Sequence, residues 1–416
     1  MTRLKIFVSA YACEPGLGSE IGVGWHWVLE MSKYFDLWVL TRQSNRQTIE
    51  PWIAGHPEYS HIRFLYFDLP KWARFWKKGL RGVRTYYNIW QWITNGIVRR
   101  TMQENNIHVF HHLTYGNVLW DVSRYGQKQF FIWGPAGGVE TIPEEYSRHY
   151  PKKMQWVERV RRMVADNLQH NSGFRRRCKN ADLILCKTDI LRRHIPECFR
   201  DKAVLFTDVA VDTSMEATIT PAPSEKSQNK SVEFITVGRL DPWRGFDLTI
   251  EAFAKATQKE SNIHLTIIGK GADKERLEAL IDRLQLTDKV TMAGAVSMES
   301  YQVYMRRCDV VVNASLKEGA VTVSFDSMAM GKPLICIDTT GYTRYFSPEY
   351  AEIVQISDRN TTIEALAASM VKLTDPHVRY EMGRQAQEAG KQFTWENRGK
   401  EIYTVITQAL KEKGIV

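Results

Sequence analysis

The sequence predicts an α/β protein with two doubly wound domains that face each other across a cleft. Apolar, strand-like runs alternate with helix-like runs through the first 200 residues, and a second such series begins after residue 231. This alternation is typical of parallel sheets covered by helices on both faces. A polar stretch with two prolines, residues 213–231, separates the two series and is the best linker candidate. Ligands of such sheets bind beyond the carboxyl ends of the strands, so the functional residues are expected there.

The elements of the first series are strands that are rich in aliphatic and aromatic residues. They are expected at residues 5–10, 36–41, 62–68, 107–114, 129–135, 181–188 and 202–208. The second series is more regular, with strands expected at 233–238, 263–269, 289–294, 309–315 and 333–337. Helices are expected between them at 246–258, 273–286 and 298–307, and from about Thr322 to the Gly331-Lys332-Pro333 stop.

The first strand has a second interpretation. Arg3 and Lys5, a short apolar stretch and Ala10-Tyr11-Ala12 before Cys13 also resemble a bacterial lipoprotein signal. The apolar stretch is only about seven residues long, however, and a glycine-rich loop, a helical pattern and another strand follow Cys13. A strand, a glycine-rich turn, a helix and a strand make a βαβ unit, which is the interpretation we favour.

Composition and charge constrain the partners. The chain has 416 residues, 44% of them hydrophobic, and no apolar run long enough for a transmembrane helix. Residues 1–215 contain 31 Lys and Arg against 20 Asp and Glu, a balance of +11, whereas the remainder has 25 against 27, a balance of −2. A basic first half indicates an acidic partner.

The six cysteines form no regular framework, which fits a reducing compartment. Zinc binding by Cys186, His194 and Cys198 is a minor alternative.

The second series has the strongest chemical signal. Arg239 lies just past a strand, and Arg244 follows five residues later before a helix. Two guanidinium groups near one site suit a diphosphate, because they pair phosphate oxygens in bidentate hydrogen bonds. The amides of residues 321–323 are expected at a helix N-terminus, which is a natural anion site. Asp326, one turn further, is placed to accept hydrogen bonds from two ribose hydroxyls. Each feature by itself more often has only a structural role.

Together, "VGRLDPWRGF" and "EGAVTVSFDSMAMGKPLI" resemble glycosyltransferases of the GT-B fold, family 4 type, with two Rossmann-like domains. The resemblance implies a retaining hexosyltransferase that uses a UDP- or GDP-sugar and needs no cofactor or metal. The sequence itself contains no Asp-x-Asp pair, which leaves a metal-bound diphosphate unsupported. It places the acceptor domain at residues 1–205 plus 396–416 and the donor domain at 213–395. The residues that it implies for the donor are Gly18, Gly238, Arg239, Arg244, Gly294, Val296, Glu318, Gly319, Val321, Thr322, Val323 and Asp326. The family more often has Lys at position 244 and Glu at position 326.

The first domain supplies further candidates. By resemblance, a histidine at the end of the strand in "VFHHLTYGN" contacts the donor sugar, and the alignment leaves His111 and His112 open, with His112 slightly favoured. Catalytic roles are thus expected for His112 or His111, with Glu318, Arg239 and Arg244. "SEIGVGW" and "WGPAGGVE" resemble a subgroup found among bacterial polysaccharide gene products. Glu20 and Glu140 lie in these stretches and are acceptor-side candidates, although a cap or solvated role is the more common one.

Residues 71–100 combine eight basic residues, no acidic one and seven aromatics. Such a stretch suits the headgroup region of an anionic membrane, or else has a core-facing aromatic stripe and a solvated basic face. We therefore expect a cytoplasmic enzyme, peripheral at the inner membrane face, that acts on a lipid-linked or glycan acceptor in cell-envelope biosynthesis and binds no nucleic acid. The alternatives are a sugar-nucleotide epimerase of the same fold and a non-catalytic binding protein.

Overall fold

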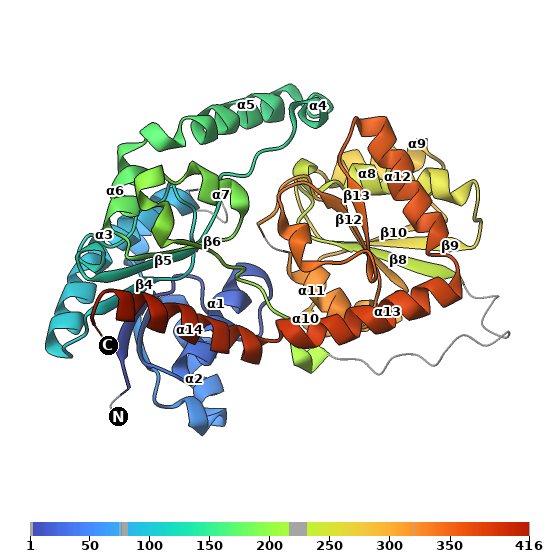
Figure 1. The fold of residues 1–416 in the computed structure, drawn as a ribbon. Coiled ribbons are helices and arrows are strands. Elements are labelled where there is room, and N and C mark those ends of the chain that lie inside the picture. The colour runs from blue at the N-terminus through green and yellow to red at the C-terminus, as the bar shows by residue number, and fades with distance from the viewer. Residues whose placement is uncertain (1–2, 75, 77–81, 216–230, 320, 416) are drawn as a thin grey trace. The chain divides into compact units, whose positions relative to one another are not determined.

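The computed structural model describes residues 3–74, 76, 82–215, 231–319 and 321–415 (Figure 1). The chain divides into two compact units. The first unit is Met1–Val139, Ala165–Asp208 and Trp395–Val416, and the second is Glu140–Val164 and Val209–Thr394. The expected acceptor domain, 1–205, thus includes a segment, Glu140–Val164, whose contacts are with the second unit. Most of the expected linker, residues 216–230, lies outside the described residues.

The first unit contains a parallel sheet of seven strands in the order β3-β2-β1-β4-β5-β6-β7. Its strands are β1 (Lys5–Ser9), β2 (Asp36–Arg42), β3 (Arg63–Phe67), β4 (Val109–His112), β5 (Phe130–Ala136), β6 (Leu183–Cys186) and β7 (Ala203–Leu205). Strand β1 lies in the middle, where Ile6 is in register with Leu37 of β2 and Val109 of β4. The opening stretch is therefore a buried central strand in this fold.

Helices flank this sheet. They are α1 (Ser19–Ser32), α2 (Arg46–Gly55), α3 (Val83–Glu104), α6 (Ser172–Asn180), α7 (Asp189–His194) and α14 (Trp395–Glu412). Helix α14, the last of the chain, packs on α1, with Trp395 stacked on His26 at 4.8 Å between ring centroids. Gly399 allows this contact, since a Cβ there would lie 2.7 Å from a carboxylate oxygen of Glu30.

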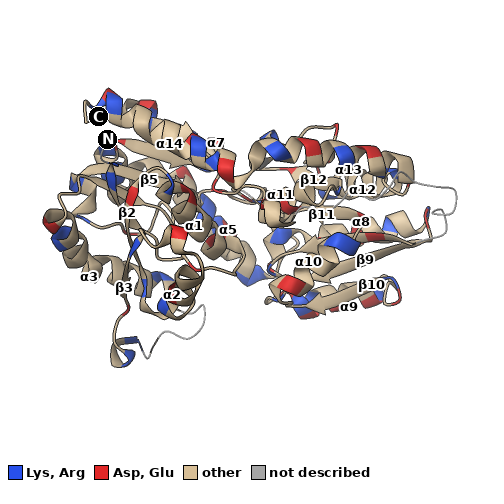
Figure 2. Cartoon of the chain, turned by 90° about the horizontal axis from the view of Figure 1, so that it is seen from below, with Lys and Arg blue, Asp and Glu red and all other residues tan. Residues whose placement is uncertain are grey.

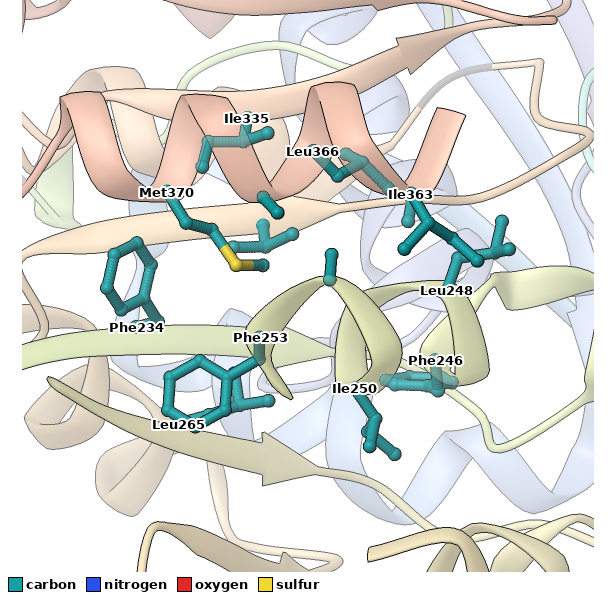
Figure 3. Close-up of a cluster of buried hydrophobic side chains, with 14 of the residues drawn as sticks. Phe234, Phe246, Leu248, Ile250, Phe253, Leu265, Ile335, Ile363, Leu366 and Met370 are labelled. Atoms are coloured by element: carbon teal, nitrogen blue, oxygen red, sulfur yellow. The ribbon is translucent and has the colours of Figure 1, made fainter. Parts of the chain in front are cut away.

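The second unit repeats the topology with six parallel strands in the order β10-β9-β8-β11-β12-β13. The strands are β8 (Val232–Val237), β9 (Ile263–Ile268), β10 (Val290–Gly294), β11 (Val310–Asn313), β12 (Leu334–Asp338) and β13 (Ala351–Gln355). The helices are α8 (Phe246–Thr257), α9 (Lys274–Arg283), α10 (Met298–Arg307), α11 (Thr322–Ala329), α12 (Arg359–Lys372) and α13 (Pro376–Gly390). Figure 3 shows the core between α8, α12 and the sheet, where Phe246, Ile250 and Phe253 are buried as the sequence pattern predicts. The predicted fold class, with two doubly wound parallel sheets, is confirmed.

The segment Glu140–Val164 carries α4 (Glu144–Ser147) and most of α5 (Lys152–Asp166). The Tyr146 hydroxyl donates to Thr362 Oγ1 at 2.6 Å, and the Tyr150 hydroxyl donates to the Pro242 carbonyl at 3.0 Å. Both tyrosine rings are buried. These contacts fix the segment to the second unit although its sequence lies between two strands of the first sheet.

Two sequence hypotheses can be compared with the described residues. No helix among them is long and apolar enough to span a membrane. They also contain no group of three or more His, Cys, Asp or Glu side chains that could hold a metal ion. Zinc binding by Cys186, His194 and Cys198 is therefore unsupported: Cys186 is buried in β6, Cys198 is exposed, and His194 Nδ1 contacts the Ile190 carbonyl at 2.8 Å.

Candidate functional site

The loops after β8 and β11 are locked together at the carboxyl edge of the second sheet. Gly245 has a φ of +68°, and a Cβ at this position would lie 1.9 Å from the Ala314 carbonyl oxygen. Only glycine tolerates both the left-handed backbone and this close approach. The Leu316 amide donates to the Trp243 carbonyl at 2.9 Å, so the two loops also share a backbone hydrogen bond. The sequence thus holds the residues before α8 against the residues after β11.

This contact brings Arg244 and Glu318 into a direct ion pair between Nη1 and Oε1. The Ser315 hydroxyl donates to the same carboxylate oxygen at 3.1 Å, and the Arg244 guanidinium lies over the Trp243 ring at 4.5 Å from its centroid. Arg244 Nε is buried without a hydrogen-bond partner among the described residues. A buried donor of this kind is costly unless something accepts from it, which makes it a natural anchor for an anionic ligand.

Lys317, next to Glu318, extends this cluster to α5. Its ammonium lies 2.7 Å from Glu158 Oε1 and 5.2 Å from the centroid of the Trp243 ring. Lys317 is 8% exposed and Glu158 is 2% exposed, so both charges are nearly removed from water. Breaking such a buried pair is strongly destabilising. Trp243, Lys317 and Glu158 were not predicted from the sequence, in which only the position of Trp243 beside Arg244 was a signal.

Arg239 follows β8 as predicted, but its side chain pairs with Asp241 rather than with the Arg244 cluster. Its Nε donates to Asp241 Oδ2 at 2.5 Å, and the side chain is 53% exposed. Gly238, the residue before it, lies along Arg244, since a Cβ there would be 3.8 Å from Arg244 Cδ. The predicted pair of arginines therefore shares one loop, with Arg244 held in place and Arg239 turned toward solvent.

Helix α11 begins where the sequence predicts, at Thr322. Val321 is its N-cap and offers no side-chain hydrogen bond, which leaves the first-turn amides of Thr322 and Val323 for a ligand. Gly319 is half-buried, and residue 320 lies outside the described residues.

Asp326 lies further along α11 and is 4% exposed. The Tyr301 hydroxyl donates to its Oδ2 at 2.6 Å. Burial raises the pKa of Asp326 from 3.8 to about 7; the Tyr301 hydrogen bond acts against this rise, and nearby Asp212 adds to it. Tyr301 was not anticipated, because it lies 25 residues away on α10.

The expected base-binding stretch starts at the end of β10. Gly294 closes the strand with a φ of +69°, and its carbonyl accepts a hydrogen bond from the Gly269 amide at 2.8 Å. A Cβ at Gly269 would lie 1.8 Å from the Gly238 carbonyl, so the loops after β8, β9 and β10 are packed side by side. Val296, two residues past Gly294, is half-buried.

His111 and His112 end β4 in the first unit and are both buried. His111 Nε2 lies 2.7 Å from the Gly134 carbonyl, to which it must donate. His112 Nε2 lies 3.1 Å from the Tyr87 hydroxyl. Burial lowers the pKa of His111 from 6.5 to about 4 and that of His112 to about 3. Both rings are thus neutral near pH 7, and the choice between them for a contact with the sugar stays a prediction.

The remaining candidates are Gly18, Glu20 and Glu140. Gly18 is the exposed N-cap of α1. Glu20 Oε1 accepts a hydrogen bond from the Tyr115 amide at 2.6 Å; burial raises the pKa of this carboxyl, whereas Lys187 and the amide lower it. Glu140 is 8% exposed and is the first residue of the segment that belongs to the second unit.

Comparisons with known proteins show what the second unit and the fold are similar to. Residues 221–393 match the family described as glycosyl transferases group 1. A relative from Campylobacter jejuni, named N-acetylgalactosamine-N,N'-diacetylbacillosaminyl-diphospho-undecaprenol 4-alpha-N-acetylgalactosaminyltransferase, is 29% identical over 161 residues, which are 38% of this chain and 42% of the relative. The chain spans about half the length of the curated relatives that it matches.

Solved structures resemble the whole chain. Sucrose-phosphate synthase from Thermosynechococcus elongatus superposes with a TM-score of 0.69 at 17% identity, covering 99% of this chain and 100% of that one. HepE from Anabaena, solved with UDP and glucose, superposes with a TM-score of 0.60 at 14% identity, covering 97% and 100%. Two doubly wound parallel units of this kind define the GT-B fold. The match to the glycosyl transferases group 1 family lies within the second unit.

Proposed function

We propose that this protein is a retaining, metal-independent glycosyltransferase, a hexosyltransferase that moves a sugar from a UDP- or GDP-sugar to a lipid-linked or glycan acceptor in the bacterial cell envelope. The observation that carries the proposal is the Arg244–Glu318 ion pair on locked loops at the carboxyl edge of the family-matched sheet. A fixed guanidinium with an unused buried Nε suits a diphosphate. The structure of HepE with UDP and glucose supports a nucleotide-sugar donor, and the name of the Campylobacter jejuni relative supports a lipid-linked acceptor.

In the proposed reaction the donor diphosphate lies between Arg244 and the first-turn amides of α11. The bond between the anomeric carbon and the diphosphate oxygen breaks while the acceptor hydroxyl forms the new bond from the same face. The hydroxyl proton passes to the departing diphosphate. Negative charge grows on that diphosphate in the transition state, and prepositioned positive groups stabilise it there more than in the ground state. Glu318 orients Arg244 and accepts hydrogen bonds from the sugar hydroxyls. Asp326 accepts from the ribose, and a neutral His112 or His111 contacts the sugar.

Thermal-shift measurements with nucleoside mono- and diphosphates test the donor site first, because a ligand that binds the native state raises the melting temperature. UDP or GDP should stabilise the wild type, and a monophosphate should do so less. Arg244→Ala and Glu318→Ala should remove the shift and the transfer activity while the protein stays folded, and Arg239→Ala should abolish transfer. The control is Arg283→Ala, which removes an exposed arginine of α9 in the same unit. Normal turnover in the site variants would refute the assignment, and isomerised donor without acceptor would favour an epimerase.

Peripheral contact with an anionic membrane through residues 71–100 is part of the proposal. Tyr86, Tyr87 and Trp90 of this stretch are buried in the core, whereas Trp72 is 79% and Trp92 is 72% exposed. Arg84, Arg99 and Arg100 are also exposed on α3. The basic residues Lys77, Lys78 and Arg81 lie outside the described residues. Figure 2 shows Lys and Arg along other helices too, so charge alone does not select this surface. The distinguishing feature is the exposed Trp92 on the same helix as the arginines.

The triple variant Trp92→Ser, Arg99→Ser, Arg100→Ser tests this contact. Each arginine near an anionic surface contributes about 1 kcal/mol, so binding to vesicles that contain phosphatidylglycerol should weaken about tenfold or more. The matched control removes three exposed charges of α6 with Arg175→Ser, Arg176→Ser and Lys179→Ser. Nucleotide affinity should stay unchanged in both variants. Equal vesicle binding by the wild type and the α3 variant would contradict the membrane contact.

A further inference from the structure

A buried hydrogen bond joins α10 to α11, the helix whose first turn and Asp326 the proposed function assigns to the donor. Tyr301 belongs to α10, which follows the expected base-binding stretch, and Asp326 belongs to α11, whose N-terminus is the expected phosphate site. The Tyr301 hydroxyl donates to Asp326 Oδ2 at 2.6 Å, and the two residues are 9% and 4% exposed. A contact this short and this well buried fixes the orientation of the carboxylate.

The carboxylate needs such a partner. A buried carboxyl group tends to take up a proton, and a protonated carboxyl loses acceptor capacity. Two titratable groups act on the pKa of Asp326 besides burial: the charge of Asp212, which precedes β8, favours protonation, and the hydrogen bond from Tyr301 of α10 opposes it. The hydrogen bond from Tyr301 therefore favours the ionised, accepting form of Asp326 and engages one of its two carboxylate oxygens. Asp is also one methylene shorter than the Glu that the family more often has at this position, so its reach depends more on orientation.

We propose that Tyr301 is a positioning residue that holds the Asp326 carboxylate for the donor ribose, leaving Oδ1 as the oxygen that accepts from the ribose hydroxyls. This inference rests on the proposed function, because it requires a nucleotide in this site. Tyr301 touches no substrate in this scheme and acts only through Asp326. Ribose recognition in this chain then depends on Tyr301 and Asp326 together, whereas the longer side chain of a glutamate could reach the ribose without a positioning partner.

Calorimetric titration can separate this role from a merely structural one. The ligands are the nucleoside diphosphate that the thermal-shift screen selects, UDP or GDP, and its 2′,3′-dideoxy analogue. Tyr301→Phe should weaken binding of the ribonucleotide about tenfold, the size expected for a hydrogen bond to a charged group. It should leave binding of the dideoxy analogue within about twofold, because that ligand has no hydroxyl for Asp326 to accept from. The double variant Tyr301→Phe, Asp326→Glu exchanges a hydroxyl for a methylene at similar volume and should restore part of the lost affinity.

The control is Tyr304→Phe, which removes a half-buried phenol hydroxyl from the same helix and should change neither affinity. If Tyr301→Phe loses the same affinity for both ligands, or loses affinity for neither, the positioning role is overturned. A wild type that still prefers the ribonucleotide would in that case leave the proposed site intact. Equal binding of the two ligands by the wild type would refute ribose recognition by Asp326 and with it the role of Tyr301. A wild type that binds neither nucleotide would refute both proposals.

Discussion

His111 is neutral and fully buried, so acid should destabilise the first unit through this ring. Its pKa is lowered from 6.5 to about 4, because burial disfavours the charged imidazole. The unfolded chain takes up a proton as the pH falls below 6.5, whereas the native ring does not accept one until about pH 4. Acidification therefore favours the unfolded chain. The stability that this histidine contributes is present above pH 6.5 and is lost between 6.5 and 4.

The size of the effect follows from proton linkage. For His111, with a pKa of 6.5 in the unfolded chain and about 4 in the native chain, acidification from about pH 7.5 to about pH 5 lowers the free energy of unfolding by about 2 kcal/mol. His112 should add a similar amount. His111→Gln isolates the contribution of His111, since the glutamine amide offers a donor to the Gly134 carbonyl but does not titrate. The pH dependence of its unfolding free energy should be shallower than that of the wild type by about 2 kcal/mol over this interval.

Urea unfolding at a series of pH values, followed by tryptophan fluorescence, measures this difference. Only two of the 13 tryptophans, Trp156 and Trp243, lie in the second unit, so the signal reports mainly on the first unit. His170→Gln, which removes an exposed imidazole of the first unit, controls for the loss of a surface histidine. Parallel curves for the wild type and His111→Gln would refute the view that burial keeps this ring neutral.

Three further outcomes are expected in the second unit. Glu158→Gln should lower the unfolding free energy of the second unit by about 2–4 kcal/mol, because Lys317 is left buried without a counter-charge. Calorimetric melting checks this, and an unchanged transition would contradict it. Gly245→Ala should cost more than Gly294→Ala, since both glycines have left-handed φ angles but only the first Cβ would meet a backbone oxygen, at 1.9 Å; similar melting temperatures would contradict that. Wild-type affinity for UDP or GDP should fall as the pH drops through about 7, where Asp326 takes up a proton, and Asp326→Asn should flatten this profile in titration calorimetry.

Strands β8 to β12 and helices α8 to α11 of the second unit were predictable because each contains a local apolar pattern that ends at a turn signal. The α11 boundary illustrates this: the helix begins at Thr322, as expected, and Gly331, with a φ of +60°, follows its end. Strand β13 was missed. It is an edge strand, so only Ala351 and Val354 are buried in it, and its sequence lacks the continuous apolar run of a central parallel strand.

The chemistry of the site was predictable only as far as the topology of parallel sheets determines it. Residues just past strand ends share one edge, which is why Arg244 and Glu318 meet although they are 74 positions apart. Side-chain direction does not follow from that rule, and Arg239 instead pairs with Asp241. The Glu158–Lys317 pair could not be anticipated either, because nothing local indicates that a helix inserted in the first series packs on the second unit.

The ion pair between Arg244 and Glu318 also bears on how a donor would bind. An arginine loses much rotamer freedom when a ligand immobilises it, and this cost weakens binding. Here the guanidinium is already held by Glu318 and by the Trp243 ring before any ligand arrives, so most of that entropy is lost during folding. Glu318 engages Nη1 of Arg244, which leaves Nε to donate to a diphosphate, so one guanidinium can hold the carboxylate and the phosphates together. In the proposed scheme the same carboxylate accepts from the sugar hydroxyls, so binding of the phosphates and recognition of the sugar both depend on this ion pair. Loss of Glu318 should therefore weaken binding of a nucleoside diphosphate and weaken binding of its sugar conjugate more.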